Sequence, residues 1–177
     1  MPFRRPALLA LPFVIALGAC QTVYENTADQ IGSARLLNAQ GVEVGAARMY
    51  SLGGEVTLNA SFSGLTPGSH AVHLHTTGQC TAPEFTSAGG HLNPAGHEHG
   101  TQNPRGAHLG DLPNVTIGAD GTGTMSAVVR GTLVGVADDI FDTDGTAIVV
   151  HAGEDDYRTD PTGNAGGRVA CGVVTRG

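Results

Sequence analysis

Short apolar runs separated by turn-forming residues make up most of the chain from residue 31 onward. In the run 55–62, apolar and polar side chains alternate, which is typical of a strand with one buried face. Gly53-Gly54 and Asp120-Gly121 are turn signals between such runs. We therefore predict eight strands, which are Ile31–Leu37, Val44–Leu52, Glu55–Phe62, Ser69–Thr76, Val115–Ile117, Gly123–Arg130, Ala147–His151 and Arg168–Val174.

No segment shows a sustained helical period, so the strand pattern predicts an all-β fold, either a sandwich or a barrel. Two stretches interrupt this pattern, residues 77–114 and residues 152–167. Both are rich in glycine, and the first is also rich in proline and histidine. Because long loops within a compact domain usually serve a function, we interpret these stretches as two functional loops.

The N-terminus has the features of a secretory signal. Arg4 and Arg5 precede an apolar stretch, residues 7–17, which is too short to cross a bilayer as a stable helix. The stretch ends in Leu17-Gly18-Ala19-Cys20, which resembles the bacterial lipoprotein box and implies a lipid on Cys20. The alternative is an ordinary signal peptide in which Cys20 is incidental.

This N-terminus predicts export to the periplasm or cell envelope, with the lipid on Cys20 as the membrane contact. The predicted division of the chain is a signal peptide at 1–19, a tether at 20–30 and one domain at 31–177. All nine basic residues are arginines, and the formal net charge is −7. Nucleic-acid binding is therefore not expected, since it depends on a basic face.

The three cysteines support this division of the chain. An odd number of cysteines in an exported protein leaves one thiol without a partner. If Cys20 carries a lipid, Cys80 and Cys171 are free to pair in an oxidising compartment.

Histidine is the residue type with the most unusual distribution. His73 and His75 lie on one face of a predicted strand and can converge on one ion, although two surface histidines are an equally common reading. Besides His97, the first loop offers three histidines and one carboxylate, a set suited to tetrahedral zinc: His91, His99, His108 and Asp111. The alternative for this loop is a solvated segment that binds metals loosely. His151 ends an apolar strand at the start of the second loop.

Several blocks of the sequence resemble the copper/zinc superoxide dismutases and occur in that family's order. They are Gly68–His75, Cys80, Gly89–Pro94, His99-Gly100, His108–Leu112, Val149–His151 and Gly163–Gly172. The resemblance covers the chain from about residue 31 to its C-terminus and implies an eight-stranded Greek-key β-barrel. It also implies one copper ion and one zinc ion per subunit.

The resemblance assigns a role to each residue of the site. Copper would be held by His73, His75, His91 and His151, and zinc by His91, His99, His108 and Asp111, so that His91 bridges the two metals. Arg168 would guide the substrate anion, and Cys80 would form a disulfide with Cys171. Asp155 would link a copper-ligand histidine to a zinc-ligand histidine. Thr162 lies near Arg168 in sequence, where it can line the substrate channel; we expect His70 near the core and His97 in solvent.

The implied reaction is the dismutation of superoxide to oxygen and hydrogen peroxide. Copper would cycle between its two oxidation states, while zinc orders the loop and polarises His91. The rival hypothesis is an envelope lipoprotein of the same fold that buffers or delivers copper and zinc without catalysis. A metal buffer needs neither a shared imidazole nor a positioned arginine, which favours the enzyme. Strand patterning does not reveal the oligomeric state, and a homodimer stays open.

Overall fold

The computed structural model describes Met1 and residues 27–177, so the predicted signal peptide and Cys20 lie outside the described residues. Strands dominate this part of the chain, and α1 (Leu133–Ile140) and the 3-10 turn η1 (Thr86–Ala88) are short. The strands are β1 (Asp29–Asn38), β2 (Glu43–Leu52), β3 (Glu55–Phe62), β4 (Gly68–His70), β5 (Val72–His75), β6 (Val115–Ile117), β7 (Gly123–Val129), β8 (Ala147–His151), β9 (Arg168–Val173) and β10 (Thr175–Arg176). In the described residues, no helix is both long and apolar enough to cross a membrane.

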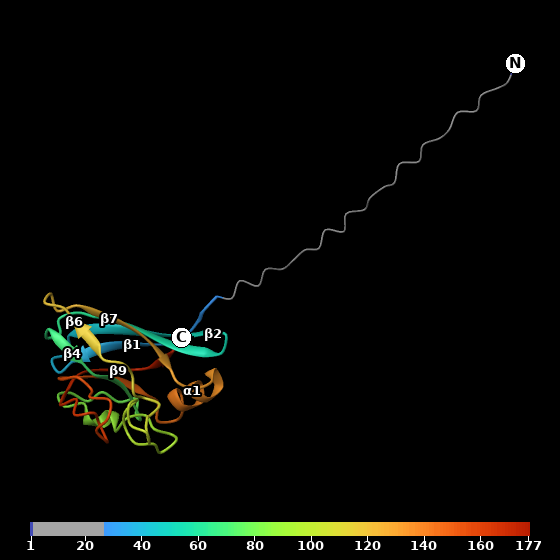
Figure 1. Ribbon diagram of the computed structural model, residues 1–177. Coiled ribbons are helices and arrows are strands. Elements are labelled where there is room, and N and C mark those ends of the chain that lie inside the picture. Colours follow the sequence, from blue (N-terminus) through green and yellow to red (C-terminus); the bar gives the residue numbers. More distant parts are fainter. Residues whose placement is uncertain (2–26) are drawn as a thin grey trace.

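The main sheet has the strand order β5-β8-β9-β1-β2-β3-β7, and β10 also pairs with β1. Every pair in it is antiparallel, and β4 pairs with β6 in a separate small sheet. Because β3 lies beside β7 and β1 lies beside β9, the chain makes the crossovers of a Greek key. Figure 1 shows the curled sheet with the long loops gathered below β9. The all-β prediction is confirmed.

Besides the short elements β10 and η1, which were not predicted, two larger details differ from the predicted elements. The predicted strand Ser69–Thr76 is divided in two, because β4 pairs with β6 whereas β5 pairs with β8. At the division, the backbone of Ala71 instead bonds to Gly153 and His151. The helix α1 was not predicted; its N-terminus is capped by Thr132, whose side-chain oxygen accepts a hydrogen bond from the backbone N–H of Gly135.

The core lies between the inner faces of the curled sheet. The apolar positions of β3, which are Val56, Leu58, Ala60 and Phe62, are all buried, as the alternating pattern predicted. A second buried cluster contains Phe85, Ala88, Ala147, Val149 and Cys171. Cys171 forms a disulfide with Cys80, with a Cα–Cα distance of 5.6 Å, so this predicted pairing is confirmed. The disulfide therefore joins the first loop to β9.

Candidate metal centre

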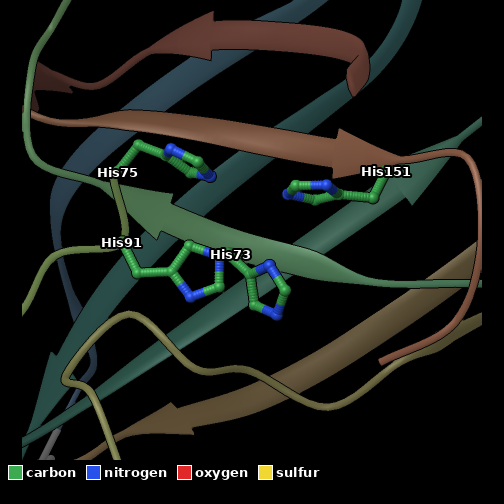
Figure 2. A group of neighbouring side chains, drawn as sticks. All are labelled: His73, His75, His91 and His151. Carbon is green, nitrogen blue, oxygen red and sulfur yellow. The ribbon is translucent and has the colours of Figure 1, made fainter. Parts of the chain in front are cut away.

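The predicted ligand histidines converge on the face of β5 and β8 that points away from the main hydrophobic core. His73 and His75 come from β5, and His151 is the last residue of β8, which pairs with β5. The first loop folds back on β5, where His91 forms a backbone bridge with His75 and Asp111 forms one with His73. Figure 2 shows His73, His75, His91 and His151 gathered around the end of β5.

Hydrogen bonds determine which nitrogen of three of these rings is free. His73 Nε2–H donates to Asp155 Oδ2 over 2.9 Å, and His75 Nδ1–H donates to the Gly89 carbonyl over 2.9 Å. His151 Nδ1–H donates to the Gly166 carbonyl over 3.2 Å. A neutral imidazole has one N–H and one lone pair, so the other nitrogen of each ring offers a lone pair.

Those lone pairs face one another and form a first cage. The four atoms are His73 Nδ1, His75 Nε2, His91 Nε2 and His151 Nε2; all are buried, and none has a hydrogen-bond partner among the described residues. They lie within 4.8 Å of one another. Opposite ligands of an ion with bonds of about 2 Å are separated by about 4 Å, so the cage has the size of a metal site. Four imidazoles suit copper.

A second cage forms around Asp111. Its Oδ1 lies 3.0 Å from His91 Nδ1, 3.0 Å from His99 Nδ1 and 3.3 Å from His108 Nδ1. Ligands at the corners of a tetrahedron with zinc–nitrogen bonds of about 2.0 Å lie about 3.3 Å apart, which these spacings match. The backbone N–H groups of Gly100 and His108 donate to Asp111 Oδ2 and fix the carboxylate.

His91 belongs to both cages. Its Nδ1 is near Asp111 and 3.3 Å from His108 Nδ1, while its Nε2 is one of the four atoms of the first cage. The rings of His73, His75 and His151 each donate a hydrogen bond to a backbone carbonyl or to Asp155. In the described structure His91 makes no hydrogen bond of either kind. Both nitrogens of one imidazole are thus directed at metal-sized cages.

Asp155 links the two cages from outside. Its Oδ2 accepts from His73 Nε2–H, and its Oδ1 accepts from His99 Nε2–H over 2.9 Å. Because a carboxylate only accepts, both rings keep Nδ1 free for the cages. Burial would raise the pKa of Asp155, but its hydrogen bonds to histidine hold that pKa below its usual range.

Burial and neighbouring charges set the protonation of the rings. Burial lowers the pKa of His73 to about 4 and that of His151 to about 3, so both are neutral at pH 7. Burial also lowers the pKa of His99, but hydrogen bonds to Asp111 and Asp155 outweigh it and raise the pKa to about 9. Without a metal, His99 therefore carries a proton that a zinc ion must displace.

Arg168 is fixed next to the first cage. Its Nη1 donates to the Phe85 carbonyl over 2.6 Å, and its Nη2 donates to the Gly89 carbonyl over 2.6 Å. The same Gly89 oxygen accepts from His75, so one peptide holds the arginine and a ring of the cage. A guanidinium has five N–H donors, and three are left to bind an anion.

The remaining predicted residues lie outside the cages. His97 is exposed, with Nδ1 3.1 Å from the Ala107 carbonyl. His70 is buried, and its ring contacts the carbonyls of His151 and Thr66. Thr162 is exposed in the second loop.

Sequence reasoning did not single out Asn114. Its side-chain amide exchanges two hydrogen bonds of 2.9 Å with the backbone of Asp155, 41 residues away. No local sequence signal marks such a contact between two loops.

Known proteins are similar to this chain in sequence and in fold. The family model "Copper/zinc superoxide dismutase" matches residues 44–174. A copper/zinc superoxide dismutase of Aquifex aeolicus is 41% identical over 146 residues, which cover 80% of this chain and 84% of that protein. One from Caulobacter vibrioides is 44% identical over 138 residues, 76% of this chain and 79% of that protein.

The crystal structure of a superoxide dismutase-like protein from Bacillus subtilis matches with a TM-score of 0.76, and that of a double mutant of it matches with a TM-score of 0.72. The first of these is 38% identical, and the match covers 82% of this chain and 99% of that protein. Family model, relatives and fold agree with the two histidine cages, so this chain belongs to the copper/zinc superoxide dismutase family.

Proposed function

We propose that this protein dismutes superoxide to oxygen and hydrogen peroxide in the cell envelope. In this proposal His73, His75, His91 and His151 hold copper, and His91, His99, His108 and Asp111 hold zinc. The observation that carries the proposal is the position of His91, whose two ring nitrogens face different cages. A protein that only stores metals has no need for a shared ring.

The residues of the chain supply binding, orientation and a proton. When bound, copper would exchange one electron with each of two superoxide anions in turn, beside a zinc ion of fixed charge. Two protons are consumed for each hydrogen peroxide formed. His91 would be placed to supply one of them from Nε2, which is buried inside the first cage.

Arg168 orients the substrate. The chain has a formal net charge of −7, so the protein as a whole repels an anion at long range. Arg158, the arginine of the second loop, donates a hydrogen bond to Gln102 of the first loop. We therefore assign attraction of superoxide mainly to Arg168, whose planar donor fork is held beside His75 through Gly89.

Activity and metal content of the purified full chain test this proposal together. The metal-free protein is loaded with copper, with zinc or with both, and superoxide loss is followed. We expect superoxide loss only in the samples that contain copper. We also expect the fully loaded protein to hold one copper ion and one zinc ion per chain. Binding of both metals without superoxide loss would instead support the rival hypothesis, a lipoprotein that buffers or delivers copper and zinc.

We also propose that a lipid on Cys20 holds the protein to a membrane. The support is the arginine pair, the apolar stretch and the cysteine that follows it. Cells grown with labelled palmitate should label the wild-type protein but not a Cys20→Ala variant. A wild-type protein that is exported without label would favour the ordinary signal peptide.

A further inference from the structure

Tyr157, in the second loop, has a backbone conformation that its residue type rarely adopts. Its φ is 61°, in the left-handed region. Such a conformation persists only where surrounding contacts hold it, and these residues gather at functional sites. The N–H, the carbonyl and the hydroxyl of Tyr157 each have a partner in the loops that frame the cages.

The backbone N–H of Tyr157 acts on the carboxylate between the cages. It donates to Asp155 Oδ1 over 2.6 Å. That oxygen also accepts from His99, and the second oxygen of Asp155 accepts from His73. A shift of Tyr157 therefore changes the orientation of one ring in each cage.

The hydroxyl of Tyr157 holds Asp155 by a second route. The backbone N–H of Asn114 donates to Tyr157 Oη over 2.8 Å. The amide of Asn114 in turn makes its two hydrogen bonds with the backbone of Asp155. Tyr157, Asn114 and Asp155 form a closed network, and Asn114 lies three residues after Asp111 of the second cage.

The carbonyl of Tyr157 contacts the first loop beside His99. It accepts from the backbone N–H of Gln102 over 3.0 Å. Gly100 has a φ of 105° and packs so closely on the Tyr157 backbone that an added Cβ would overlap the carbonyl. The first loop therefore meets Tyr157 just after His99 and again, through Asn114, just after Asp111.

We propose that Tyr157 is a positioning residue that fixes Asp155 and thereby holds the two cages in their relative orientation. This inference rests on the proposed function, in which the cages hold copper and zinc. The hydroxyl stabilises this network because it accepts the hydrogen bond of the half-buried backbone N–H of Asn114. Without the hydroxyl, that N–H has no acceptor. Tyr157 does not touch the substrate in this proposal.

The test removes one oxygen atom from the full-chain protein. Tyr157→Phe is compared with Tyr50→Phe, a matched change on β2, outside the network. In the metal-free protein, hydrogen exchange at Asn114 should become at least about tenfold faster in Tyr157→Phe only. After loading, zinc release to a chelator should also be about tenfold faster, and the absorption bands of cobalt placed in the zinc cage should shift.

A double-mutant cycle tests the route through Asn114. In an Asn114→Ala background the link to the Asp155 backbone is already lost, so Tyr157→Phe should change zinc release by less than about threefold. Additive effects of the two changes would overturn this route. If hydrogen exchange, zinc release and the cobalt spectrum of Tyr157→Phe all equal those of the wild-type protein, the inference is wrong, while the proposed function is unaffected. Failure of the wild-type protein to bind metals would overturn the proposed function, while the metal-free exchange result would still report on the network.

Discussion

Substitution of Gly163 by alanine gives a direct test of how tightly the second loop is fitted to the metal cages. Gly163 has a φ of 63°, and an added Cβ would lie 2.7 Å from His99 Nε2 and would overlap Asp155 Oδ1. Asp155, His99 or the loop backbone must then shift, which weakens the hydrogen bond between the carboxylate and His99. The metal-free loop relaxes in this way, and zinc binding has to restore the strained arrangement.

The expected effect on zinc affinity follows from two contributions. An alanine in the left-handed region costs about 1 kcal/mol. Weakening one hydrogen bond to a charged group costs about 2 kcal/mol. Together they give about 3 kcal/mol, or about a hundredfold rise in the zinc Kd. Loss of an outer partner of a metal ligand typically costs about 10- to 100-fold, which agrees.

The assay is a zinc titration of the full-chain protein in competition with a coloured chelator. Gly167→Ala is the matched control, because it lies in the same loop and an added Cβ there meets no atom within 4 Å. The control should retain the wild-type Kd. Equal zinc Kd values for Gly163→Ala and Gly167→Ala would refute the claim that this close contact orients Asp155.

Three other outcomes are expected. Zinc binding at pH 7 should release about one proton, because the pKa of His99 is raised to about 9 and zinc displaces the proton that this ring carries. The release should disappear as the pH rises through 9. Calorimetry in buffers of different ionisation enthalpy measures the number of protons released, and a release independent of pH would contradict the assignment. Arg168→Ala should lower the rate of superoxide loss and weaken its dependence on salt, and an unchanged rate and salt slope would end the steering hypothesis. Cys80→Ser removes the disulfide between residues that are 91 positions apart, and it should lower the free energy of unfolding by about 2–5 kcal/mol, measured as a lower Tm. An unchanged Tm would show that packing alone holds the loop.

The strands were predictable where one face is buried and the other is not. The alternation in β3 gave the correct bounds, Glu55–Phe62, because side-chain period alone determines which residues pack inward. The helix α1 was missed because its short sequence contains Gly135 and β-branched valines, which hide the helical period. Its cap at Thr132 and the buried pair Val136 and Ile140, four residues apart, were the signals available.

The candidate site was predictable only as far as family motifs reach. The blocks that carry His91, His108 and Asp111 are contiguous in sequence and could be recognised by resemblance. The contacts of Asn114 and Tyr157 with Asp155 depend instead on how two separate loops meet, which no local pattern encodes. Ring tautomers likewise depend on acceptors, such as the Gly89 and Gly166 carbonyls, that only the folded chain brings near.

The shared carbonyl of Gly89 limits how this protein can be altered in the laboratory. A change that moves the Gly89 carbonyl shifts both the guanidinium of Arg168 and the ring of His75, since this one oxygen accepts from both. Mutations at that peptide that are selected for a different anion would therefore also change the orientation of a predicted copper ligand. Variants that change anion preference alone should be sought at exposed positions of the second loop outside this hydrogen-bond pair, such as Thr162.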